Sequence, residues 1–222
     1  MMKIFRHISF LLLLSLFFIQ CKKNNEPEPV TFSGNVSDNV QGIPVANATV
    51  KIKLQQSASN AVFNSGFNTV ANTTTDGSGN YSVTFTPENP ITYKVIVEKN
   101  LYYAKEVEIS SDVVTSGSNT VTNFAINPIG WYKINIKNTN PNNATDNILY
   151  QTTTETNGCS TCCNNLPVNL NGMNVDTSFL CQRVANPTIS FSWFVTKNGA
   201  TTSFSNSISS IVGDTAVYNL NY

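Results

Sequence analysis

The stretch TTTDGSGNYSV, residues 73–83, decides which β fold the chain adopts. Three of its residues carry side-chain oxygens and alternate with two glycines, as at the start of a calcium loop: Asp76, Ser78 and Asn80. An EF-hand loop also needs glycine at position 6 and glutamate at position 12, and these positions hold Tyr81 and Pro87. The stretch therefore predicts the tip of a β-hairpin instead of a calcium site, with Gly77 and Gly79 supplying positive φ values.

From Val30 onward, apolar and polar residues alternate as they do in β-strands, with polar turns about every 8–12 residues. The predicted inward faces are Val50/Ile52/Leu54, Tyr81/Val83/Phe85, Tyr93/Val95/Val97 and Val107/Ile109. A new alternating strand, GWYKINIKN, begins just after Asn127-Pro128. We therefore expect an all-β chain with two tandem β-sandwich domains, residues 30–127 and 128–222, and a long hairpin excursion over residues 55–72.

Three blocks of the first half follow the order of a known family: SGNVSD (33–38), GIPVANATVKI (42–52) and TTDGSGNYSV (74–83). On these blocks, residues 30–127 resemble the carboxypeptidase regulatory-like domain, a transthyretin-like β-sandwich. The family places a Gly-Tyr pair before a later strand, and here Asn100 stands where glycine is usual. Asparagine tolerates the left-handed conformation that such a turn needs. The resemblance implies a folding, spacing or binding module of bacterial surface proteins, without catalytic residues of its own.

The first twenty residues predict a signal peptide, because a basic start precedes an apolar run from Ile8 to Ile19. That run is shorter than the roughly 20 residues that span a membrane. It leads to Cys21, and FFIQC resembles the lipobox of Bacteroidota-type lipoproteins, although Gln20 stands where that family prefers a small residue. The resemblance implies a lipid on Cys21, a polar tether over residues 21–29 and an outer-membrane location that faces the cell surface or the periplasm. An ordinary signal peptide with an unmodified cysteine is the alternative.

The charge and histidine content exclude several classes of function. The chain has 13 basic residues, 13 acidic residues and one histidine, His7, which lies in the leader. Loss of the two basic residues of the leader leaves 11 basic against 13 acidic residues, a net charge of −2 without a basic stripe for nucleic acid. A mature chain without histidine has no Ser-His-Asp or Cys-His catalysis and no histidine-ligated metal. We therefore expect no enzyme, no cofactor and no nucleic-acid partner.

Four further cysteines cluster in the second half: Cys159, Cys162, Cys163 and Cys181. Four thiolates can bind zinc, but zinc ribbons use two CxxC pairs and this chain has one. Because an exported protein leaves the reducing cytosol, we expect two disulfides and no metal. A bridge between the neighbours Cys162 and Cys163 is strained, so Cys181 is expected to join one of them and Cys159 the other.

Aromatic residues are the candidate ligand contacts. Trp131 and Trp193 can stack on sugar rings, but both lie in alternating strands, where tryptophan is more often part of the core. Tyr102 and Tyr103 are neighbours, so one of them faces outward if they lie on a strand. The outward tyrosine is the predicted contact.

Two groups of polar residues resemble functional sites, but a structural role is favoured for each. Glu106 and Glu108 share one strand face, but a flat sheet lacks the cleft that holds a glycosidase pair. The loop from Asn138 to Asn147 is rich in oxygens that calcium binds, but a Pro/Asn turn between strands is the favoured interpretation.

Two functions fit these features. The first is a non-enzymatic cell-envelope lipoprotein that acts as a binding or adhesive module for a glycan or a protein, with its lipid anchor in the membrane. The alternative is a structural accessory subunit that docks to an outer-membrane transport or secretion complex.

Overall fold

The computed structural model describes residues 28–56, 66–153 and 166–222. Within them the regular elements are β-strands apart from one 3-10 turn, η2 (Ser111–Val113), so the predicted all-β fold class is confirmed. The leader, Cys21 and three of the clustered cysteines, Cys159, Cys162 and Cys163, lie outside the described residues. None of the described helical segments is long and apolar enough to cross a membrane.

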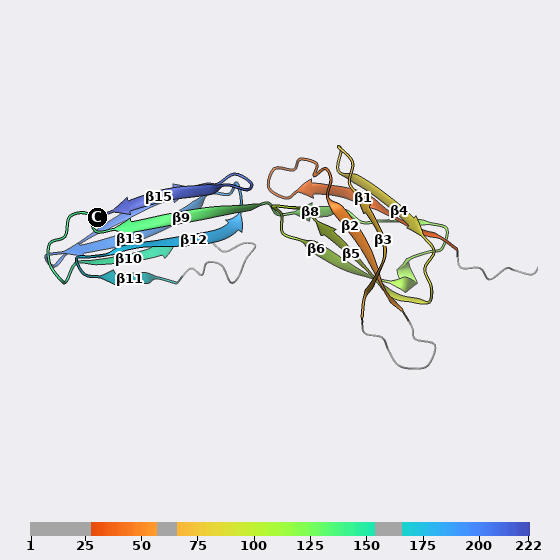
Figure 1. The fold of residues 1–222 in the computed structure, drawn as a ribbon, viewed down its shortest axis with the longest axis horizontal. Coiled ribbons are helices and arrows are strands. Elements are labelled where there is room, and N and C mark those ends of the chain that lie inside the picture. Colours follow the sequence, from red (N-terminus) through yellow and green to blue (C-terminus); the bar gives the residue numbers. More distant parts are fainter. Residues whose placement is uncertain (1–27, 57–65, 154–165) are drawn as a thin grey trace, which may run out of the picture.

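The first half consists of two sheets around one core (Figure 1). One sheet has the order β4-β1-β7, with β8 also pairing with β1, and the other has the order β3-β2-β5-β6. The strands are β1 (Val30–Asp38), β2 (Thr49–Gln56), β3 (Asn68–Thr74), β4 (Asn80–Phe85), β5 (Pro90–Glu98), β6 (Lys105–Ser110), β7 (Asn119–Val121) and β8 (Phe124–Ile126). The predicted inward faces of β2 and β5 are buried and pack against Phe32 and Val36 of β1. The antiparallel pairing of β2 with β3 is the hairpin expected there, although residues 57–65 between them are outside the described ranges.

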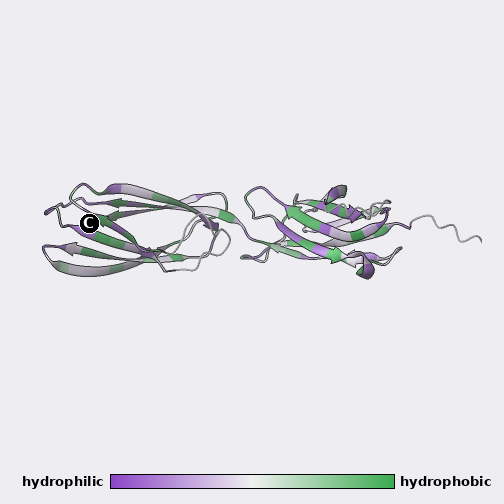
Figure 2. Cartoon of the chain, turned by 90° about the horizontal axis from the view of Figure 1, so that it is seen from below, coloured by the Kyte–Doolittle hydropathy of each residue, from purple (hydrophilic) through white to green (hydrophobic). Residues whose placement is uncertain are grey.

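The second half has its own two sheets and its own core. The sheet orders are β11-β10-β13-β14 and β12-β9-β15. The strands are β9 (Ile129–Lys137), β10 (Asn147–Thr152), β11 (Val168–Asn171), β12 (Asp176–Val184), β13 (Ile189–Lys197), β14 (Ala200–Ile208) and β15 (Thr215–Asn221). Alternation along β9 buries Tyr132, Ile134 and Ile136, and apolar segments alternate with polar ones along the strands in both halves (Figure 2).

The DGSGNY turn is not the hairpin tip that we predicted. It leads from β3 to β4, but β3 pairs with β2 and β4 with β1, so the turn passes between sheets. Gly79 has a positive φ of 76°, whereas Gly77 is not in the left-handed region. An added Cβ at Gly79 would lie 2.4 Å from a carbonyl oxygen of β1. Both the positive φ and this close approach therefore require glycine at position 79. The Asp76 carboxylate accepts the N–H groups of Ser78 and Asn80 at 2.9 and 2.8 Å, so it closes the turn.

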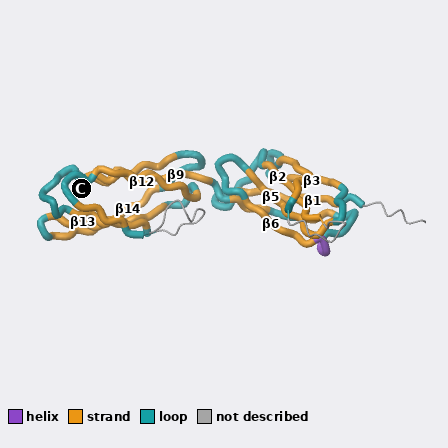
Figure 3. The backbone as a smooth tube through the Cα atoms, turned by 60° about the horizontal axis from the view of Figure 1, so that its bottom comes forward, coloured by secondary structure: helices purple, strands orange, loops and turns teal. Residues whose placement is uncertain are grey.

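The two sheets of the second half differ in width. β14 is the edge strand of a four-stranded sheet, and the facing sheet has three strands (Figure 3). From Ala200 to Ser207, every residue of β14 is exposed, on both faces of the strand. Because the facing sheet is narrower, the inner face of β14 has no strand packed over it.

The two halves meet at a short connection. Only Asn127 and Pro128 separate β8 from β9, and the N–H of Ile129 donates to the carbonyl of Leu101 at 2.7 Å. The left-handed residue in this region is Leu101, with φ 65°, and not Asn100 as the family resemblance implied.

Candidate functional site

The uncovered face of β14 forms one side of an open groove of about 390 Å³. The lining residues come from β13, β14, the last residue of β15 and the residue after it: Trp193, Val195, Lys197, Ala200, Thr202, Phe204, Asn221 and Tyr222. Small-ligand sites are typically about 300–1,000 Å³ and are mostly apolar with a few polar groups. The groove has this size and this mixture of residues.

Two stacked rings form the apolar surface of the groove. Trp193 is only 8 % exposed and belongs to the core, which confirms the prediction for this residue. The register of β13 and β14 places Phe204 opposite Trp193, and their ring centres lie 5.5 Å apart with planes inclined by 16°. Phe204 is 45 % exposed, so one face of the pair is open to a ligand.

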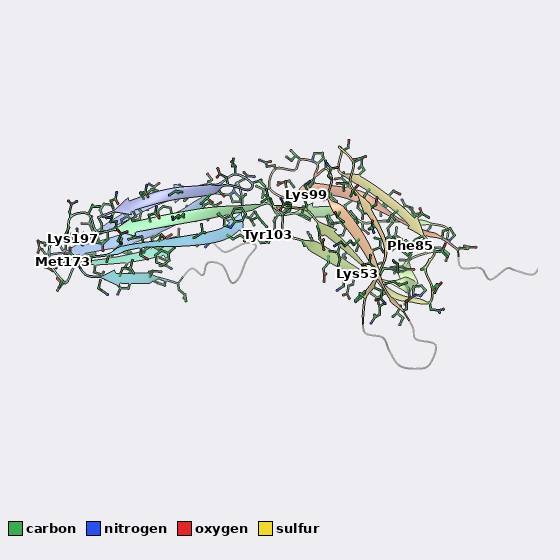
Figure 4. All side chains as sticks on the ribbon, viewed as in Figure 1. Lys53, Phe85, Lys99, Tyr103, Met173 and Lys197 are labelled. Carbon is green, nitrogen blue, oxygen red and sulfur yellow. The ribbon has the colours of Figure 1, made fainter. Side chains whose placement is uncertain are left out.

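Polar side chains lie on either side of the two stacked rings. Toward the junction, the amide of Asn206 on β14 donates to the hydroxyl of Tyr218 on β15 at 3.0 Å and ties the two layers together. Lys197 lies at the other end, far from Tyr103 at the junction (Figure 4).

Lys197 supplies the positive charge of the groove. Its ammonium group donates to the side-chain oxygen of Asn138 at 3.0 Å and to the carbonyl of Asn140 at 2.6 Å. It lies 5.0 Å from the ring centre of Tyr222, and burial followed by the nearby Asp146 charge raises the pKa of that tyrosine. In the described part of the chain no carboxylate lies within ion-pair distance of Lys197, although its charge helps to lower the pKa of the nearby Asp146.

The oxygen-rich loop beside Lys197 is a turn held together by Asp146. This carboxylate is completely buried and accepts hydrogen bonds from the N–H of Asn142 at 2.8 Å and from the side chain of Asn138 at 2.9 Å. These donors, the Asn142 amide first, hold the pKa of Asp146 below its usual value. Its oxygens are therefore occupied within the fold, which fits the turn interpretation.

The predicted tyrosine contacts lie elsewhere. Neither is on a strand, because β6 begins at Lys105, and neither is freely exposed. The hydroxyl of Tyr102 donates to Asp38 at 3.1 Å, and that of Tyr103 is buried without a hydrogen-bond partner among the described residues. The expectation of one outward tyrosine assumed that both lie on a strand, and that condition is not met. Tyr102 does border a second, polar hollow of about 520 Å³, with Asn47, Thr49, Glu98, Lys99, Asn100 and Ala104.

The other candidate residues from the sequence, one tryptophan and two glutamates, lie on exposed sheet faces outside the groove. Trp131 is half-buried on the outer face of β9, so the prediction that it belongs to the core was wrong. Glu106 and Glu108 of β6 both form ion pairs with Lys94 of the neighbouring strand β5, at 3.2 and 2.9 Å, on an exposed sheet face. They form surface ion pairs of the kind that contributes little to stability.

Cys181 lies on β12 and is disulfide-bonded. The other cysteines of the cluster fall outside the described residues, so the pairing stays a prediction. Among residues 28–56, 66–153 and 166–222, no three His, Cys, Asp or Glu side chains are placed to hold a metal ion.

Sequence reasoning missed Phe204 as a candidate contact residue. The Asn198-Gly199 pair, with φ values of 49° and 76°, forms a two-residue hairpin turn that is readable from sequence. Counting an equal number of residues along both strands from that turn places Phe204 opposite Trp193. What the sequence does not indicate is that the facing sheet stops one strand short.

No family model and no curated protein sequence matches this chain. The Bacillus anthracis TIE protein is 12 % identical over 87 % of this chain and 34 % of its own, with a TM-score of 0.38. A Streptococcal ancillary pilin is 12 % identical over 87 % of this chain and 62 % of its own, with a TM-score of 0.34. The shaft pilin SpaA from Lactobacillus rhamnosus GG is 9 % identical over 87 % and 97 %, with a TM-score of 0.32. This chain thus spans about a third of the length of the TIE protein. These likenesses are too weak to carry a functional argument.

Proposed function

We propose that this protein is a non-enzymatic lipoprotein of the cell envelope that binds a glycan in the groove between β14 and β15. The observation that carries the proposal is the stacked pair of Trp193 and Phe204, which is open on one side because no strand covers β14. A soluble protein gains stability by burying such a ring, so an exposed, supported aromatic face is a candidate contact surface.

The chemistry of the groove suits a sugar ring. The apolar C–H face of a sugar can pack on Phe204, while its hydroxyl groups meet Thr202 and Asn221 along the lining. Lys197 adds a cation that neutral oxygens hold in place. Because no carboxylate forms a direct ion pair with that cation in the described residues, a glycan with an acidic sugar is favoured over a neutral one.

Two exposed phenylalanines of the β13-β14 hairpin provide a test of glycan binding and its matched control. Phe204 and Phe194 are 45 % and 44 % exposed, but Phe194 pairs with Ser203 and lies on the opposite face of the sheet. Residues 22–222 are screened against acidic and neutral glycans, and affinities are measured by calorimetry. We expect Phe204→Ala to weaken binding by about tenfold or more, as loss of an aromatic contact does, and Phe194→Ala to leave it unchanged. Equal losses for both variants, or no glycan bound by a folded protein, would contradict the proposal.

The proposed anchor is a lipid on Cys21 in the outer membrane. It rests on the apolar run that ends in FFIQC and on the polar tether over residues 21–29. Cys21→Ala is expected to move the protein from the membrane fraction to the soluble fraction and to abolish incorporation of a labelled fatty acid. Protease treatment of intact cells then distinguishes a surface-facing from a periplasm-facing protein.

A structural accessory subunit of an outer-membrane complex is the second candidate function. It is favoured by the outer face of the β12-β9-β15 sheet, where Leu180 and Val217 are 62 % and 52 % exposed on either side of Lys133. Photo-crosslinking from position 180 in intact cells is expected to give one dominant partner, and crosslinking from exposed Glu108 of the first half serves as the control. No adduct from position 180, in a protein that remains monomeric, eliminates this function.

A further inference from the structure

The outer edge of β14 is an unprotected sheet edge. Its nine residues, Ala200–Ile208, include no charged residue and no proline, and the register with β13 runs without a shift. Native proteins protect such edges with charges, prolines, bulges or short strands because unpaired backbone groups invite another strand. Of the other described edge strands, β6 and β12 carry charges and β3 pairs through a bulge, while β4, β7, β8, β11 and β15 are shorter than β14.

The register identifies which backbone groups face outward from β14. In a two-residue hairpin the residues beside the turn, here Lys197 and Ala200, form a hydrogen-bonded pair, and such pairs then recur at every second residue. Phe204 belongs to this series and bonds to β13. The N–H and C=O groups that point away from β13 are those of Thr201, Ser203, Ser205 and Ser207, and among them the N–H of Ser207 already donates to the side-chain oxygen of Asn206 at 2.7 Å.

The sequence of β14 is nearly symmetric about Phe204. Ser203 is identical to Ser205, and farther out Thr202 corresponds to Asn206 and Thr201 to Ser207, all of them uncharged polar residues, whereas Ala200 and Ile208 at the ends differ. Antiparallel pairing of two such strands places a small polar residue opposite a small polar residue on both sides of the centre. It also brings no two like charges together, because β14 carries none.

We propose that β14 pairs antiparallel with β14 of a second copy of this chain, about a two-fold axis through Phe204. The outward residues then form hydrogen-bonded pairs, Ser203 with the partner's Ser205 and Thr201 with the partner's Ser207, while Phe204 faces its own counterpart in a non-hydrogen-bonded pair. The four-stranded sheets join into one continuous sheet, and the two open grooves face each other across the axis. This pairing does not depend on glycan binding.

Cysteine cross-linking tests the register directly. In a non-hydrogen-bonded antiparallel pair the Cα atoms lie about 4.5 Å apart, which a disulfide can span. Phe204→Cys in the full chain, expressed with its leader and extracted in detergent, is therefore expected to form a dimer on a non-reducing gel. Thr202→Cys is the matched control, because the two copies of position 202 lie about 14 Å apart in this register. Equal cross-linking of both variants, none at position 204, or an adduct with a different protein overturns the proposal.

A proline variant tests the pairing without a new thiol. The N–H of Ser205 points away from β13, so Ser205→Pro removes an outward donor and leaves the hairpin bonds in place, and Ser205→Ala keeps that donor. By sedimentation in detergent, the wild-type chain and Ser205→Ala are expected to be dimers and Ser205→Pro a monomer. A monomeric wild-type chain, or a Ser205→Pro dimer, refutes the pairing; the cysteine test decides if Ser205→Pro does not fold.

Discussion

Thr75 gives the sharpest test of how the fold-deciding stretch works. Its side chain is 2 % exposed and bridges two backbone groups of the segment before β2. The hydroxyl accepts the N–H of Ala48 at 2.8 Å and donates to the carbonyl of Val45 at 2.6 Å. Thr75→Val keeps the shape of the side chain and removes both hydrogen bonds, whereas Thr75→Ser keeps both bonds and removes one methyl group.

The two substitutions lower the free energy of unfolding by different amounts, because only Thr75→Val leaves buried backbone groups without a hydrogen-bond partner. Ala48 and Val45 are 0 % and 4 % exposed, so water does not replace the lost hydroxyl. A buried backbone group without a partner costs about 1–3 kcal/mol, so two of them reduce the free energy of unfolding by about 2–6 kcal/mol in Thr75→Val. The buried methyl group lost in Thr75→Ser is worth about 1 kcal/mol. We therefore expect the serine variant to be the more stable of the two, although valine is the more hydrophobic residue.

Urea unfolding separates the affected half from the other. Both tryptophans, Trp131 and Trp193, lie in the second half, so tryptophan fluorescence follows that half while circular dichroism follows both. With an m-value of about 1.5 kcal/mol/M, a loss of about 3 kcal/mol lowers the circular dichroism midpoint of the first half by about 2 M. The fluorescence midpoint should not change. A valine variant as stable as the wild type, or more stable than the serine variant, would refute this reasoning.

Two further predictions concern the turn and the loop beside the groove. Gly79→Ala is expected to destabilise the first half by about 1 kcal/mol or more, because of its positive φ and its contact with β1, whereas Gly77→Ala, with nothing near its added Cβ, should stay within about 0.5 kcal/mol in the same assay. The pKa of Asp146 is lowered in the fold, so its contribution to stability is present above the unfolded pKa of about 3.9 and is lost as pH falls through the lower folded value. Asp146→Asn should therefore be less stable than the wild type at pH 7, and the gap should narrow toward pH 3 by tryptophan fluorescence; a gap independent of pH contradicts this role.

The fold class was predictable because alternation is a local property. The faces predicted for β2 and β5 are buried as expected, since every second residue of a strand lies on the same side. The turn at Asp76 was misassigned for a physical reason. A tight turn with a left-handed glycine serves a hairpin or a crossing between sheets equally well, and only long-range pairing of β4 with β1 decides between them.

The candidate site was less predictable because it depends on the widths of two sheets. Trp193 was correctly placed in the core, but alternation says the same of Trp131, which faces outward on β9. Tyr102 was singled out from its position beside a second tyrosine, and its hydroxyl instead binds Asp38. Phe204 reads as an ordinary strand residue, and its exposure follows only from the absence of a strand over β14.

The groove and the sheet edge have one structural origin, and they can still be tested separately. A facing sheet one strand wider would cover Phe204 and leave no groove, and a strand beyond β14 would remove the free edge. On β14, however, the two features use different residues: the inner face presents Phe204 to the groove, and the outward backbone groups belong to positions such as Ser205. Phe204→Ala should therefore weaken glycan binding and keep every outward hydrogen bond, while Ser205→Pro should abolish pairing and keep the affinity of each groove. If Ser205→Pro also lost glycan affinity, the ligand would have to contact both copies, and the site would be the joined groove of the dimer.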